Sequence, residues 1–128
     1  LMGSAYGAFL VAQQAARRMQ GAGSGTILFT GASASVKGYP NSAPFAMGKF
    51  ALRGLAESLA RELQPQNIHV AHFVIDGAIR NPGRTEPADN PDSMLDPDAI
   101  AETYWQVANQ DRSAWTFEVA LRPWVEKF

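Results

Sequence analysis

The sequence has no cysteine, no excess of one charge and no long hydrophobic run, and each absence excludes a class of function. Without cysteine the chain has no disulfide scaffold, thiolate zinc site or cysteine nucleophile, which is compatible with a cytoplasmic protein. A formal net charge of −1 argues against nucleic acid or an acidic membrane surface as the principal partner, because both bind a clustered basic face. No apolar segment is long enough to span a bilayer. We therefore expect a cytoplasmic protein with no nucleic-acid partner and no membrane partner.

The first residues also lack the features of a signal peptide. They contain no basic segment and pass directly into a helical pattern. No capping residue or linker precedes that helix, so we expect a fragment that starts inside an element. With 128 residues there is room for one modest domain and one core.

Hydrophobic periodicity predicts alternating helices and strands. The expected helices cover residues 6–20, 44–64 and 97–110, and the expected strands cover residues 26–30, 68–75 and 114–121. The first two strands are continuous apolar runs, typical of strands covered on both faces. Strands separated by single helices imply right-handed parallel crossovers. We therefore predict an α/β fold, part of a doubly wound, Rossmann-like parallel sheet in three α/β/α layers.

The most informative stretch is residues 45–49, near the start of the second predicted helix. Pro44 favours a helix start at this point. Phe45 and Lys49 lie one turn apart, so their side chains share one face of that helix. A strand and a loop rich in glycine and serine, residues 30–38, come directly before it.

This arrangement resembles the short-chain dehydrogenase/reductase family, whose Tyr-x-x-x-Lys signature places a Tyr and a Lys beside the nicotinamide. Residues 49–63 closely match the family's helix, and the resemblance extends over nearly the whole chain. It implies a single partial Rossmann-like domain over residues 1–128, the C-terminal half of the family's fold, which lacks the N-terminal half with its cofactor fingerprint. For the complete protein it implies NAD(P)-dependent hydride transfer on a carbonyl or alcohol substrate.

The loop after the first strand resembles the family's phosphate-binding loop, Thr-Gly-x-x-x-Gly-x-Gly, but lacks two of its three glycines. Ser35 and Lys37 occupy those positions, where glycine allows a tight turn and close approach of the backbone to pyrophosphate. Lys37 precedes Gly38 instead of following a glycine, so the segment is not a P-loop either. We infer that the chain has no phosphate-binding fingerprint, and that the choice between NAD and NADP belongs to the absent half.

The resemblance implies roles for residues around this loop and helix. Lys49 corresponds to the lysine that binds the ribose hydroxyls, and Phe45 stands in place of the catalytic Tyr. Ala32 stands at the position of the catalytic Ser. Ser33, next to it, is the candidate replacement and Ser35 a weaker one, although loop serines equally well bond their own backbone.

The segment after the second strand resembles the family segment that holds the nicotinamide carboxamide through backbone atoms and a Thr. Gly77, Ile79 and Asn81 are the corresponding candidates for cofactor binding, with Asp76 replacing a Pro and Asn81 replacing the Thr. An amide both donates and accepts hydrogen bonds, so Asn81 suits a carboxamide, and it suits a turn equally well.

Phe45 keeps the aromatic ring of the catalytic Tyr and removes its transferable proton. Loss of a positioned acid typically costs on the order of a hundredfold to ten-thousandfold in rate. Two classes of function stay open: an oxidoreductase in which Ser33, Tyr39 or water replaces the Tyr, and a catalytically silent binding or assembly subunit. Hydride exchange or cofactor quenching by the full-length protein distinguishes the two.

The predicted partners are a small-molecule substrate and further copies of the chain. The first strand would expose unsatisfied backbone groups at a sheet edge, and the first two helices resemble the pair that forms the family's four-helix dimer interface. We therefore expect a homodimer or a higher homo-oligomer. No metal site is predicted, because His69 and His72 point to opposite faces of a strand and no cysteine or carboxylate cluster supports them.

Overall fold

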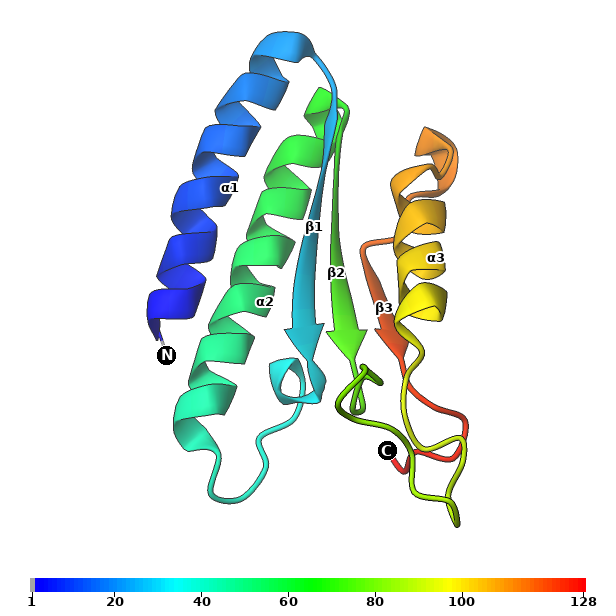
Figure 1. Cartoon of the computed structure of the whole chain (residues 1–128). Coiled ribbons are helices and arrows are strands. Elements are labelled where there is room, and N and C mark those ends of the chain that lie inside the picture. Colours follow the sequence, from blue (N-terminus) through cyan, green and yellow to red (C-terminus); the bar gives the residue numbers. More distant parts are fainter. Residues whose placement is uncertain (1) are drawn as a thin grey trace.

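The chain forms a layered α/β unit built on one parallel sheet with the strand order β1-β2-β3 (Figure 1). This computed structural model describes residues 2–128, with side chains from residue 5 onward. None of the helices within these residues has both the length and the apolar character needed to cross a membrane. In chain order the elements are α1 (Met2–Ala22), β1 (Gly25–Ala32), α2 (Ala43–Leu63), β2 (Ile68–Ile75), α3 (Pro97–Ala108) and β3 (Glu118–Leu121).

Helices cover both faces of the sheet, with α1 and α2 on one face and α3 on the other (Figure 1). Val70 packs with Phe29 and Leu63 in the core beneath α1 and α2. Phe73 packs with Val107 in the core beneath α3. All the residues of β2 are buried, because its alternating side chains enter two different cores. The predicted three-layer fold is therefore confirmed.

Within the described residues, β1 forms one edge of the sheet. It pairs in parallel with β2 along its whole length, from Gly25 opposite Ile68 to Ala32 opposite Ile75. β3 lies on the other side of β2 and pairs only with its second half. The outer edge of β1 therefore has backbone groups without a strand partner in this part of the chain, as the sequence predicts.

The starts of α2 and α3 are set in different ways. Asp96 caps α3, because its carboxylate accepts a hydrogen bond from the Asp98 N–H at 3.0 Å. At the N-cap position of α2, the Ser42 hydroxyl instead donates to the Pro40 carbonyl at 3.4 Å. The start of α2 therefore depends on Pro44 in its first turn and not on a side-chain cap.

The last strand is shorter than the sequence predicts. It covers Glu118–Leu121 instead of residues 114–121. Arg112–Ala114 form a 3-10 turn, and the Gln110 side chain then bonds the Thr116 N–H and the Thr116 hydroxyl, each at 2.8 Å. A side chain therefore bonds a backbone N–H group that the hydrophobic periodicity predicts to be part of the sheet.

Candidate active site

The carboxyl ends of the three strands lie at one end of the sheet, where α2 also begins (Figure 1). There β1 runs into a 3-10 turn, Ser33–Ser35, and β2 runs into the segment that starts with Asp76 and Gly77. Ligands of open α/β sheets bind in the crevice outside the carboxyl ends of the strands. This end of the molecule is therefore the candidate site, and it is also where the sequence places the candidate residues.

The first turns of α2 hold Phe45 and Lys49 side by side. The Lys49 ammonium lies 5.7 Å from the centroid of the Phe45 ring, within the range of a cation–π attraction. Lys49 is partly buried, and within residues 2–128 it forms no ion pair with a carboxylate. The Phe45 ring is 51% exposed. The site therefore presents a cationic donor beside an aromatic ring that has no hydroxyl.

The two candidate serines have different environments. Ser35 is completely buried, and its Oγ accepts a hydrogen bond from the Ala32 N–H at 3.0 Å. Ser33 is partly buried, and its carbonyl accepts from the N–H groups of Val36 (3.1 Å) and Lys37 (3.0 Å). Ser35 thus holds the turn together, which leaves the Ser33 hydroxyl as the serine group with access to a ligand.

The end of β2 is fixed to the end of β3. The Asp76 N–H donates to the Leu121 carbonyl at 2.8 Å, and the buried Asp76 carboxylate accepts from Arg122 Nε at 3.1 Å. Gly77 follows with a φ of +150°, and a Cβ there would lie 3.0 Å from Pro123 Cδ. The backbone conformation therefore favours glycine at this position, and a Cβ would have little space there.

Ile79 and Asn81 lie farther along the same loop. Ile79 is exposed, and its segment bridges to Leu95 through the Arg80 N–H and Leu95 carbonyl at 2.9 Å. Asn81 lies in a turn of its own, where its Oδ1 accepts from the Gly83 N–H at 2.9 Å. The structure therefore brings Phe45 and Lys49 together, whereas Asn81 takes the alternative role of a turn residue with its side-chain oxygen.

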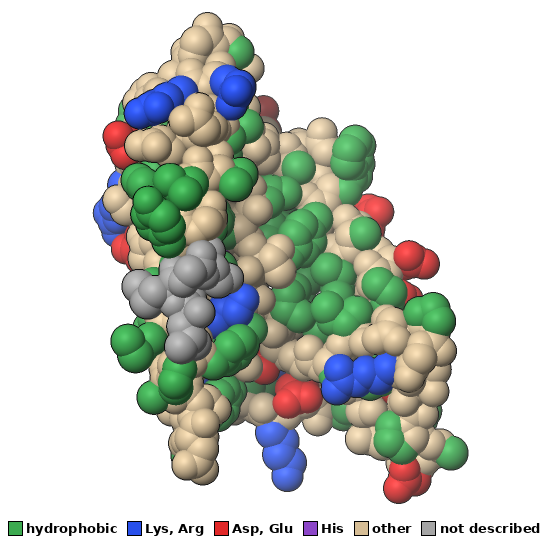
Figure 2. Space-filling model, turned by 60° about the vertical axis from the view of Figure 1, so that its left-hand side comes forward, with side chains coloured by type: hydrophobic (Ala, Val, Ile, Leu, Met, Phe, Trp, Pro, Cys, Tyr) green, Lys and Arg blue, Asp and Glu red, His purple; other side chains and the backbone are tan. Residues whose placement is uncertain are grey.

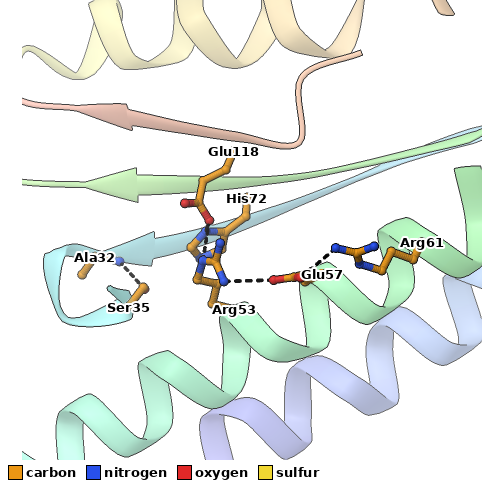
Figure 3. A network of polar contacts seen from close by, with 7 residues as sticks. All are labelled: Ala32, Ser35, Arg53, Glu57, Arg61, His72 and Glu118. Atoms are coloured by element: carbon orange, nitrogen blue, oxygen red, sulfur yellow. Dashed lines mark hydrogen bonds and ion pairs between the residues drawn. The ribbon is translucent and has the colours of Figure 1, made fainter. Parts of the chain in front are cut away.

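A polar network behind the site links α2 to β2 and β3 (Figure 3). Glu118 Oε2 accepts hydrogen bonds from Arg53 Nε at 2.6 Å and from His72 Nδ1 at 3.2 Å. Arg53 also contacts Glu57 at 3.0 Å, and Glu57 contacts Arg61 at 3.2 Å. The hydrogen bond to Glu118 raises the pKa of Arg53 above its ordinary value. Burial lowers the pKa of His72 below its ordinary value, against the opposing effect of Glu118, so the imidazole is neutral at neutral pH.

The sequence alone does not reveal this network. The spacing of Arg53 and Glu57 indicates a contact on one helix face, since residues four apart are neighbours. The strand register is the missing information, because it sets Glu118 opposite His72. A histidine within an apolar strand does indicate a buried polar contact, since a buried polar side chain requires a hydrogen-bond partner.

His69 and His72 lie on opposite faces of the sheet, as their spacing predicts. The His69 ring stacks on Trp115 with centroids 4.6 Å apart, and its Nε2 lies 2.7 Å from the Thr116 carbonyl. His72 instead faces Arg53 and Glu118. Within the part of the chain that the structure describes, no three His, Asp or Glu side chains come together as a group that could hold a metal ion.

The segment that contains β1, α2 and β2 also matches a known protein family. A family model for the short chain dehydrogenases matches residues 4–88, which include Phe45 and Lys49. The chain belongs to the short-chain dehydrogenase family. Its three parallel strands and covering helices agree with the family's Rossmann-like fold.

Parts of this chain align with a curated dehydrogenase and a curated reductase. The chain is 44% identical over 62 residues to a 3alpha-hydroxysteroid dehydrogenase of Mediterraneibacter gnavus. The aligned segment covers 48% of this chain and 25% of that protein. The chain is 41% identical over 73 residues to the 3-oxoacyl-[acyl-carrier-protein] reductase MabA of Mycobacterium bovis, which covers 57% of this chain and 29% of the reductase. The aligned part is thus under a third of either relative's length.

A solved short-chain dehydrogenase from Rhodopseudomonas palustris extends the likeness to most of the chain. The two structures superpose with a TM-score of 0.70 at 45% sequence identity, over 88% of this chain and 44% of the other. The structural likeness therefore extends beyond residues 4–88, the segment that the family model matches.

Proposed function

We propose that this chain forms the catalytic end of an NAD(P)-dependent oxidoreductase that interconverts a carbonyl and an alcohol when the protein is complete. The observation that supports it is the Lys49 ammonium, held one helical turn from Phe45 at the carboxyl ends of the strands. Family membership supports the same reaction class. The substrate is a small molecule, and we propose a cytoplasmic location.

The described residues fit the nicotinamide end of such a cofactor and not its pyrophosphate end. Among the described residues the Lys49 ammonium has no carboxylate partner. Asn81 uses its side-chain oxygen in the turn, which leaves its amide N–H groups to donate. This chain has no fingerprint for the pyrophosphate, because Ser35 and Lys37 stand where the glycines of such a loop would be needed. The bound nicotinamide would supply the hydride donor or acceptor.

Each candidate residue then has a defined task. Lys49 binds the ribose hydroxyls, the backbone of Gly77 and Ile79 holds the carboxamide, and Asn81 adds a hydrogen bond from its amide. Ser33 orients the substrate oxygen through its hydroxyl. Hydrogen-bond donors aimed at an oxygen that gains charge stabilise the transition state.

Phe45 requires the proton to come from another group. A Tyr at this position would donate a proton to the substrate oxygen, and its pKa would be tuned by the adjacent Lys49. With phenylalanine present, the donor is the Ser33 hydroxyl, the Tyr39 hydroxyl or a water molecule. Tyr39 lies on the loop between β1 and α2 and is 44% exposed.

We propose that the protein is a homodimer or a higher homo-oligomer that associates through α1 and α2. Large hydrophobic side chains are exposed on both helices, and Figure 2 shows hydrophobic groups on this side of the molecule. An apolar helix surface of this kind is suited to a self-complementary interface. The exposed members are Tyr6, Phe9, Leu10 and Val11 on α1, and Met47 and Phe50 on α2.

The proposed function is tested with the full-length protein, by following NADH and NADPH oxidation with a panel of ketones and aldehydes. Lys49→Ala is expected to weaken cofactor binding, whereas the matched variant Lys37→Ala, on the exposed loop, is expected to leave it unchanged. Cofactor binding without hydride transfer would assign the protein to the catalytically silent class. Absence of both binding and transfer would overturn the proposal.

A further inference from the structure

Two buried polar groups converge on the same backbone position, Gly31. A Cβ added to Gly31 would collide with Nε2 of His72 and with Oγ of Ser35. Both side chains are fully buried, and they come from different elements, the strand β2 and the turn after β1. The glycine is therefore required by the approach of these two side chains.

The hydrogen-bonding needs of the two groups are complementary. His72 Nδ1 faces the Glu118 carboxylate at 3.2 Å, so Nδ1 bears the proton and donates it. In a neutral imidazole the other nitrogen is then an acceptor, and Nε2 is a buried atom without a partner among the described residues. Ser35 Oγ accepts from the Ala32 N–H, which leaves its own hydroxyl proton to donate.

We infer that His72 is a positioning residue, whose Nε2 accepts the Ser35 hydroxyl proton and thereby holds the turn Ser33–Ser35 against β2. Figure 3 draws two separate groups of contacts, the bond from the Ala32 N–H to Ser35 and the contacts of His72 and Arg53 with Glu118. The inferred bond between Ser35 and His72 would join them. It joins the turn after β1 to the helix that bears Lys49. Its effect on the reaction, through Ser33, rests on the proposed function.

Protonation of His72 reverses this arrangement. An imidazolium has N–H groups on both nitrogens, so Nε2 can no longer accept from Ser35. The charged groups that face His72 are Glu118 from β3, which favours protonation, and Arg53 and Lys49 from α2, which oppose it together with burial. Burial is the largest of these effects and lowers the pKa of His72, so the contact is present at neutral pH and lost in acid.

The two histidines of the sequence give an internal comparison. His69 Nε2 faces the Thr116 carbonyl, which can only accept, so His69 has its proton on Nε2. The inference requires the opposite tautomer at His72, with the proton on Nδ1. Nitrogen and carbon NMR of the imidazole rings in full-length protein distinguishes the two forms without any substitution. A proton on Nε2 of His72 at neutral pH, or a charged ring there, would overturn the inference.

The contact with Ser35 is tested by the variant Ser35→Ala, with Ser33→Ala as the matched control in the same turn. Ser35→Ala removes a hydrogen bond to the neutral imidazole, so the His72 proton affinity is expected to rise roughly two- to tenfold. In the wild type, the amide resonances of Ala32 and Ser33 should change with pH as His72 becomes protonated. In Ser33→Ala, the Ala32 amide should behave in the same way. The inference is wrong if the His72 titration is unchanged in Ser35→Ala. It is also wrong if the amide resonances of the turn in the wild type do not change as His72 is protonated.

Discussion

The Lys49 ammonium lies 5.7 Å from the centroid of the Phe45 ring, so the cation faces an aromatic ring where a phenol would have supplied a proton. The aromatic ring and the ammonium are therefore both in place, and only the phenol oxygen is missing. The family's signature has Tyr here, and a phenol beside an ammonium has a lowered pKa because the cation favours the phenolate.

Restoring the phenol is expected to raise or create carbonyl reductase activity. Phe45→Tyr in the full-length protein should increase the rate by on the order of a hundredfold or more, the range typical for a positioned acid. The check is a panel of ketones and aldehydes with both NADH and NADPH. Phe50→Tyr, on the same helix and also exposed, is the matched control and should have no effect. If no substrate in the panel responds to Phe45→Tyr, the pocket does not support the family's reaction.

Residues 1–128 expressed alone are expected to bind NAD(H) and NADP(H) only negligibly. The reason is the lack of a glycine fingerprint that would seat the pyrophosphate on a helix N-terminus. Titration calorimetry should therefore detect no saturable binding tighter than about 1 mM, which corresponds to roughly 4 kcal/mol. Tighter binding would mean that the pyrophosphate has another site on this chain.

Gly31→Ala is expected to destabilise the fold. The added methyl group enters the space of His72 Nε2 and Ser35 Oγ, and overpacking of this kind typically costs about 1–3 kcal/mol. Gly21→Ala is the matched control, because a Cβ at Gly21 of α1 meets no atom within 4 Å. Alanine in a helix is favoured over glycine, so the control should be neutral or stabilising by up to about 1 kcal/mol. Urea denaturation of both variants gives the comparison.

Stability is expected to fall as the solution is acidified below the ordinary histidine pKa. Burial lowers the pKa of His72 in the folded state below the unfolded value of 6.5, so the unfolded chain binds more protons in the interval between them. The contribution of His72 is therefore fully present above that unfolded value and is lost as the pH falls toward the folded one. Urea titrations across this interval measure the slope. His72→Gln should flatten it.

The full-length protein is expected to sediment as a dimer or larger oligomer at tens of micromolar. The exposed hydrophobic side chains of α1 and α2 motivate this expectation, and Val11 is 72% exposed. Val11→Glu should shift the equilibrium toward monomer, because it places a charge within an apolar interface. Gln66→Glu, in the turn before β2, adds the same charge outside that surface and should leave the mass unchanged. A monomeric wild type would exclude self-association through these helices.

The layers of the fold could be predicted from sequence because they depend on local patterns. The continuous apolar run at residues 68–75 indicates a strand with two covered faces, and β2 has this environment. The length of the last strand could not be predicted, because the Gln110 side chain replaces sheet pairing at Thr116. That competition depends on the position of a side chain after folding, which periodicity does not contain.

The candidate site could be predicted only in part, for a related reason. Helical spacing places Phe45 and Lys49 on one face, and the structure brings them together. The serines could not be ranked, since only burial separates Ser35, which bonds the Ala32 N–H, from the more accessible Ser33. Glu118 could not be connected to His72, because their contact depends on the register between two strands far apart in sequence.

Arg53 lies one helical turn after Lys49, so its link to Glu118 ties the face of α2 that bears the lysine to β3. Apolar burial is not directional, so it restrains the rotation of a helix about its long axis less specifically than an ion pair does. The Arg53 Nε contact of 2.6 Å with Glu118 resists that rotation, because rotation of α2 would pull the guanidinium away from β3. The position of the Lys49 amine around the axis of α2 therefore depends on the contact with β3. A deletion of β3 would remove Glu118 and with it this restraint on α2, although Phe45, Lys49 and the serine turn would all still be present.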